Sequence, residues 1–125
     1  MTRFLLDTDC AIYAMLGTHP ELGVRLSECE PDEVAISAIS YAEIMLGETQ
    51  GKPPDLDVVD AFVSVVPVLP FDEAAGRAYA ALPFRRASFD RLIAAHALSI
   101  EATVITNNEA DFADLPGLRV ENWTR

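Results

Sequence analysis

Short apolar runs alternate along this chain with longer stretches in which apolar residues recur every three or four positions. The short runs are typical of buried strands, and the periodic stretches are typical of helices that bury one face. Strands are predicted at residues 4–6, 34–37, 66–69, 103–105 and 118–120. Helices are predicted at residues 11–16, 21–29, 39–46, 56–65, 73–82 and 89–100, with a single helical turn at 109–114.

Strands that alternate with helices predict an α/β fold, because each helix connects two parallel strands and covers one face of the sheet. We expect a single three-layer domain over residues 1–125, with a central, mostly parallel five-stranded sheet and helices on both faces. Pro67 places the 66–69 strand at a sheet edge, because proline cannot donate to a neighbouring strand. Residues 47–54 contain two glycines, two prolines and the only lysine, and are predicted to form a surface loop or a mobile clamp.

The clearest helix follows Ser88, which is a favoured N-cap residue. Its apolar positions recur at helical spacing, and one face therefore carries Phe89, Leu92, Ile93, His96, Ala97 and Ile100. That face is expected to be buried, and His96 is accordingly interpreted as a core residue with its hydrogen bonds satisfied.

Composition limits the classes of function. Half of the 125 residues are hydrophobic, which predicts a folded protein, and the net charge of −11 argues against a protein that coats nucleic acid with a basic face. The same charge allows a metal site made of carboxylates, or a basic partner. Cys10 and Cys29 are too few for a disulfide framework, so a reducing cytoplasm is expected. No run approaches the roughly 18 apolar residues of a membrane span, so no membrane partner is expected.

Acidic residues occur where predicted strands give way to helices. Asp7 directly follows the first strand, Glu43 lies one turn into the helix after the second, and Asp90 lies in the first turn of the helix after Ser88. The fourth strand is followed by Asn108 and Asp111. Because the carboxyl ends of parallel strands share one edge, we expect these groups to converge. Each acid taken alone also has a structural explanation, such as capping or a favourable helix-dipole interaction of roughly 0.3–1 kcal/mol.

Converging carboxylates repel one another, which raises their pKa values, and a divalent cation relieves this repulsion. A site with oxygen ligands alone favours Mg²⁺, with Mn²⁺ also accommodated, and suits phosphoryl chemistry. Hydroxyl groups at the same strand ends are candidates for supporting the acids by hydrogen bonding, or for local turn and cap bonds instead. These are Thr8, Ser37 and Thr106.

Three arginines flank Asp90, although the chain has only nine basic residues. Arg85, Arg86 and Arg91 are candidates for holding substrate phosphates beside the metal. The alternative interpretation is a solvated helix start in which these side chains pair with nearby acids.

Five segments, in order, resemble the PIN-domain ribonucleases, and within them the VapC-type toxins of bacterial type II toxin–antitoxin systems. The segments are residues 4–9, 36–44, 89–98, 104–112 and 115–123. The resemblance implies a five-stranded parallel sheet and Mg²⁺-dependent cleavage of RNA. It also implies a homodimer, a cognate antitoxin whose tail covers the active site, and higher toxin–antitoxin assemblies.

Asp7, Glu43 and Asp90 match the three most regular acids of that family. Many members have an aspartate where Asn107 and Asn108 stand here, so the resemblance leaves Asp111 or Asn108 as the fourth member of the site. Residues 83–88 form a shorter link into the Asp90 helix than is usual in the family, which bears on substrate fit more than on metal binding.

Two other functions remain open from the sequence. Residues 5–9 also resemble the opening motif of haloacid-dehalogenase-type phosphatases, but Ala11 stands where that motif prefers threonine or valine, and the required lysine is represented only by Lys52. The second alternative is a catalytically weak PIN scaffold that binds RNA or a protein partner.

Overall fold

A computed structural model describes residues 1–83 and 85–125 of the chain. In this part of the chain, five parallel strands form a sheet in the order β3-β2-β1-β4-β5. The strands are β1 (Phe4–Leu6), β2 (Val34–Ser37), β3 (Val68–Leu69), β4 (Thr103–Ile105) and β5 (Val120–Glu121). The predicted α/β fold is confirmed, and β3 lies at the sheet edge, as Pro67 indicated.

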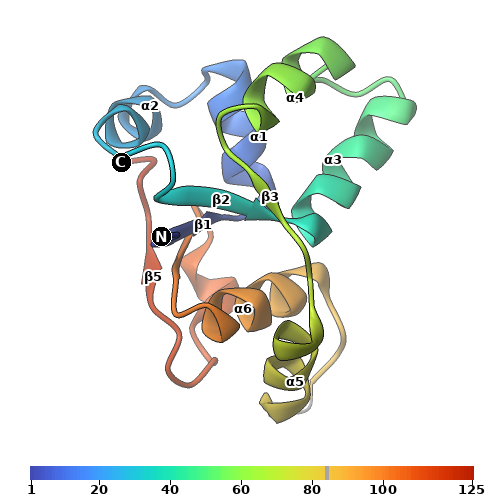
Figure 1. Cartoon of the computed structure of the whole chain (residues 1–125), viewed down its shortest axis with the longest axis vertical. Helices are drawn as coiled ribbons and strands as arrows, with labels where there is room; N and C mark the ends of the chain where they lie inside the picture. The colour runs from blue at the N-terminus through green and yellow to red at the C-terminus, as the bar shows by residue number, and fades with distance from the viewer. Residues whose placement is uncertain (84) are drawn as a thin grey trace.

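Helices cover both faces of the sheet, so the molecule has three layers (Figure 1). On one face lie α1 (Thr8–Leu16), α2 (Pro20–Ser27), α3 (Ala38–Thr49) and α4 (Leu56–Val63). On the other lie α5 (Glu73–Ala81) and α6 (Phe89–Ser99), and the 3₁₀ turn η1 (Glu109–Phe112) packs against α6. No helix in the described residues is long and apolar enough to span a bilayer.

The register of the central strands separates two cores. Leu5 is level with Ala35 and Val104, and these side chains pack against α6. The next residue along each strand points to the opposite face, because side chains alternate in a strand. Leu6 and its neighbours therefore pack beneath α1 to α4.

Apart from α2, the α-helices of the described residues begin at side-chain caps. The capping residues, each accepting a backbone N–H of the helix it precedes, are Asp7, Ser37, Asp55, Asp72 and Ser88. Asp7 immediately follows β1 and Ser37 ends β2, so α1 and α3 start directly at the carboxyl edge of the sheet. Residues in their first two turns are thereby placed at that edge.

Several predicted boundaries are corrected by the structure. Helix α1 begins at Thr8 rather than residue 11, because Asp7 caps it. Helix α3 continues to Thr49, so residues 47–49 are helical and the predicted loop is shorter. The last strand is Val120–Glu121 instead of 118–120. Phe89 is 56% exposed, not buried, because the first turn of α6 extends beyond the core.

The buried Trp123 joins the last strand to the first. Its ring lies edge-on to Phe4 with centroids 4.7 Å apart, and Arg25 stacks over its other side. We expect Trp123→Ala to lower the free energy of unfolding by about 3–5 kcal/mol, the usual cost of removing a large buried aromatic side chain. Urea denaturation followed by far-UV circular dichroism measures this.

Val24→Ala is the control for that substitution, because Val24 is 57% exposed and its loss should change the free energy of unfolding by less than about 0.5 kcal/mol. A cost below about 1 kcal/mol for Trp123→Ala would contradict the anchoring role assigned to this ring.

Candidate active site

Asp7 is held rigidly between the ends of two strands. Its backbone N–H donates to the Ile105 carbonyl of β4 over 2.9 Å. Its carboxylate Oδ1 accepts the Cys10 backbone N–H at 2.8 Å, which caps α1. The residue is only 5% exposed. The carboxyl group is therefore fixed in place, with little water around it.

Glu43 reaches the same edge from the second turn of α3. The Thr8 hydroxyl donates to Glu43 Oε1 over 2.6 Å, so the first residue of α1 orients this carboxylate. The contact joins two helices that follow neighbouring strands. Glu43 Oε2 remains the other oxygen through which this carboxylate can contact a ligand or a water molecule.

Asp90 and Asp111 lie beside each other at the other helical layer. Asp90 is in the first turn of α6, and Asp111 is in η1, within hydrogen-bonding range of Asp90. The Asn108 side-chain amide donates to Asp111 Oδ2 over 2.6 Å. Both candidates for the fourth position are therefore at the site, and they contact each other.

The surroundings of the carboxyl groups at this edge disfavour their ionised form. Burial raises the pKa values of Asp7 and Glu43. The pKa of Asp90 rises to about 6, first through burial and then through repulsion from Asp111, Asp7 and Glu43. A bound cation would reverse these shifts, because it favours the ionised form of every one of them.

The donor chemistry fits a hydrated Mg²⁺ or Mn²⁺ ion. Within the described residues, no three His, Cys, Asp or Glu side chains gather closely enough to form a ready-made cluster of direct ligands. Mg²⁺ commonly retains several water ligands and uses only one or two carboxylates directly. Two of the acids can therefore bind such an ion directly, and the others can act through water.

Of the three predicted hydroxyl residues, Thr8 and Thr106 form hydrogen bonds at the site, and Ser37 forms one with a buried residue. Thr106 accepts the Asn108 backbone N–H at 3.0 Å, and hydrogen bonding by its side chain opposes the rise in the Asp7 pKa. Ser37 caps α3 and shares a 2.7 Å hydrogen bond with His96 Nδ1. In the described structure, Ser37 thus serves the α3–α6 contact rather than the acids. His96 is buried and hydrogen-bonded, as predicted.

Arg91, predicted to hold a substrate phosphate, lines the same cavity as Asp90, but its side chain is largely engaged within the fold. Its side chain is 9% exposed, donates to the Pro83 carbonyl and lies 3.6 Å from Asp114. Its charge is therefore used inside the fold. Arg85 also pairs with Asp114 at 3.1 Å, but its side chain remains 64% exposed. Arg85 and Arg86 line a cavity of about 320 Å³ together with Asp90 and Asp111.

Two features of the site were missed by the sequence analysis. The Ser40 hydroxyl is buried without a hydrogen-bond partner among the described residues, one turn before Glu43. Ser40 lies three residues after the cap Ser37 and three residues before Glu43. This is the spacing of residues on one face of a helix, and it could have indicated Ser40 from the sequence.

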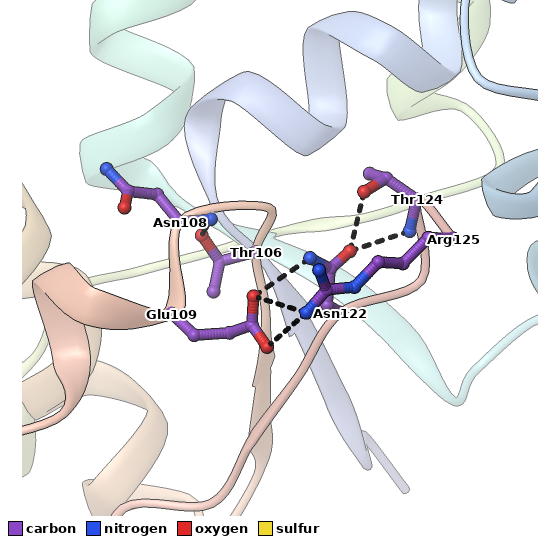
Figure 2. Close-up of polar contacts among 6 residues, drawn as sticks. All are labelled: Thr106, Asn108, Glu109, Asn122, Thr124 and Arg125. Atoms are coloured by element: carbon purple, nitrogen blue, oxygen red, sulfur yellow. Dashed lines mark hydrogen bonds and ion pairs between the residues drawn. The ribbon is translucent and has the colours of Figure 1, made fainter.

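The second missed feature is the attachment of the chain's last residues to the turn that bears the fourth site group. Glu109 accepts the Asn122 side-chain N–H at 2.9 Å and pairs with Arg125 at 3.2 Å. In Figure 2 the Asn108 side chain points away from this ion pair. Nothing in the spacing of these residues indicates the contact, because they are distant in sequence.

A family model described as PIN domain matches residues 4–118. A tRNA(fMet)-specific endonuclease VapC from Shigella flexneri is 32% identical, with 99% of this chain and 100% of the relative covered. Ribonuclease VapC2 from Rickettsia felis is 29% identical, with 98% of each chain covered.

Solved structures agree with these sequence matches. VapBC2 from Rickettsia felis, bound to a DNA fragment from its promoter, superposes with a TM-score of 0.87 at 27% identity, covering 98% of this chain and 99% of the other. DNA-bound VapBC from Salmonella typhimurium gives a TM-score of 0.84 at 31% identity, with the same coverage.

This chain belongs to the PIN-domain family, in its VapC group. The predicted resemblance is confirmed. The match extends over β1 to β4 and every acid discussed above, and it favours the nuclease family over the phosphatase alternative.

Asp90→Asn should make the metal-free protein more stable at neutral pH. The folded state raises the Asp90 pKa from 3.8 to about 6, so folding favours the protonated carboxyl. The stability from this group is present at low pH and lost as pH rises through this window. In EDTA we therefore expect Asp90→Asn to raise the melting temperature at pH 7 and to leave it nearly unchanged near pH 3.5.

Asp57→Asn is the matched control, because Asp57 is also the second residue of a helix but is exposed and far from the strand ends. It should slightly lower the melting temperature through the lost helix-dipole interaction. Equal effects of the two substitutions at pH 7 would show that the carboxylates do not repel one another at the site.

Proposed function

We propose that this chain is a Mg²⁺-dependent endoribonuclease, the toxin of a toxin–antitoxin pair, acting as a single PIN domain. The observation that carries the proposal is the convergence of Asp7, Glu43, Asp90 and Asp111 at one sheet edge, where the pKa values of Asp7, Glu43 and Asp90 are raised. Membership of the VapC group supports the activity, since curated relatives are named as ribonucleases. Mg²⁺ is chosen, with Mn²⁺ as the substitute, because all donors are oxygens.

Asp7 and Asp90 would hold the cation, completed by Asp111 and the Asn108 carbonyl oxygen. The cation would polarise the scissile phosphate and stabilise negative charge on the leaving oxygen. The side chains of the protein shape the site around the cation and carry the proton transfer. Buried Asp7 excludes water from one wall of the site, and the Asn108–Asp111 hydrogen bond keeps the fourth group in place.

Glu43 is the proposed general base. Thr8 occupies Oε1, so Oε2 would accept a proton from the water that attacks phosphorus. The bond between phosphorus and the leaving ribose oxygen breaks, and that oxygen takes its proton from solvent. A carboxylate within reach of the attacking water can take its proton in this way.

Exposed Arg85 and Arg86, which line the cavity beside Asp90, are proposed to hold backbone phosphates there. Such contacts position RNA without reading its sequence. The name of the Shigella flexneri relative makes tRNA(fMet) the first RNA to test.

A cognate antitoxin is the proposed protein partner, because the similar solved structures are toxin–antitoxin complexes. A homodimer, higher toxin–antitoxin assembly and action in the cytoplasm complete the proposal. A catalytically weak scaffold remains the alternative function. The retained acids and their electrostatic strain argue against it, because a pure binding scaffold gains nothing from buried, mutually repelling carboxyls.

Asp7→Asn should abolish RNA cleavage and keep the fold. Asparagine caps helices about as well as aspartate, so α1 should retain its first turn. Changes to groups that merely orient metal ligands cost about 10–100-fold, so loss of a ligand should cost at least that much. Cleavage of tRNA(fMet) and of total RNA is measured in Mg²⁺, in Mn²⁺ and in EDTA, and EDTA should stop the wild-type reaction.

Asp55→Asn controls for capping and charge, because Asp55 caps α4 through the same contact but lies outside the site. It should cleave at the wild-type rate. If Asp7→Asn cleaves as fast as Asp55→Asn, the assignment of the site is wrong. If the folded wild-type protein neither cleaves RNA nor gains thermal stability with Mg²⁺, the scaffold alternative is correct.

A further inference from the structure

A groove of about 270 Å³ adjoins Glu43 and shares no lining residue with the cavity beside Arg85 and Arg86. Its lining residues come from α1, α3, the segment at residues 50–54 and the first residue of α6. Its lining includes Thr8, Glu43, Leu46, Lys52 and Phe89. The proposed mechanism uses Thr8 and Glu43 but leaves the other three without a role.

Phe89 presents an aromatic face beside the site. It is the first residue of α6, adjacent to Asp90, and is 56% exposed, although Ile93 and Ala97 of that helix are buried. Leu46 is 58% exposed on the α3 side of the groove. Two large apolar side chains are thus left in water beside the carboxyls, where helix packing does not require them.

Lys52 adds a positive charge to the same groove. It is the only lysine in a chain of net charge −11, and it lies just beyond the end of α3. The groove therefore combines a carboxylate site, an aromatic face and a cation. An unpaired nucleotide has complementary features: a reacting phosphate, a planar base and a flanking phosphate.

We propose that Phe89 stacks against the base of an RNA nucleotide next to the scissile phosphate, and that Lys52 contacts a flanking phosphate. This rests on the proposed function, and it assigns the groove to RNA rather than to a protein. The charge of Lys52 and the continuity with Glu43 favour RNA, because an apolar peptide segment would use Phe89 and Leu46 but would leave the lysine without a partner. Stacking of this kind tolerates any base, so it contributes affinity and position.

The test measures binding to an eight-residue oligouridylate with one central 2-aminopurine, whose fluorescence is quenched by stacking. All variants carry Asp7→Asn in Mg²⁺, so that the RNA stays intact. Phe89→Leu keeps an apolar side chain but removes the ring, and should weaken binding about 10-fold with loss of quenching. Phe89→Tyr should restore both, and the exposed Val65→Ala should change neither.

Lys52→Gln tests the phosphate contact. It should lower the slope of log K against log salt by about 0.7, the value for one phosphate of a single strand, while Lys52→Arg keeps the slope. Equal affinity and quenching for Phe89 and Phe89→Leu, or an unchanged salt slope for Lys52→Gln, would overturn the corresponding half of the inference.

Cleavage by the protein without Asp7→Asn is assayed in parallel and separates the two proposals. RNA cleavage together with unchanged binding by Phe89→Leu overturns the groove assignment alone. Quenched, Phe89-dependent binding without any cleavage in Mg²⁺ or Mn²⁺ overturns the proposed nuclease function and supports the groove as an RNA site.

Discussion

Parallel pairing of β1 with both β2 and β4 is the constraint on which the rest of the structure depends. It brings the carboxyl ends of three strands to one edge of the sheet. The hydrogen bond from the Asp7 N–H to the Ile105 carbonyl fixes the backbone of Asp7 at that edge. Helices α1 and α3 start there without an intervening loop. Acidic groups carried by separate parts of the chain are consequently held together by backbone geometry, even though their charges repel.

This arrangement costs stability in the metal-free protein. Burial and mutual repulsion both disfavour ionised Asp90, and burial disfavours ionised Asp7 and Glu43. The fold offsets part of the cost locally, through the Cys10 N–H to Asp7 and the Thr8 hydroxyl to Glu43. The rest of this electrostatic cost is relieved when a cation binds, because a bound positive charge stabilises ionised carboxylates. The site therefore has affinity for a cation.

The first turn of α6 organises both sides of the site. Asp90 belongs to the acid cluster, Phe89 faces the groove beside Glu43, and Arg91 turns inward to pair with Asp114. Buried Arg91 connects this turn to the segment before it through the Pro83 carbonyl. Arg91, which directly follows two candidate functional residues, thus has a structural role, because successive residues of a helix point in different directions.

The sequence determined the order of strands and helices, the α/β class, and Asp7, Glu43, Asp90 and the 108–111 segment as the candidate site. These depend on local periodicity and on the general rule that parallel strand ends share an edge, both of which are readable from residue spacing. Only the tertiary structure decided that Phe89 is exposed and that Arg91 forms its ion pair inside the fold. It also decided that Ser37 forms a hydrogen bond with His96 and that Arg125 forms an ion pair with Glu109. The physical reason is that burial and pairing depend on which distant segments pack together, and helical or strand period does not encode that choice.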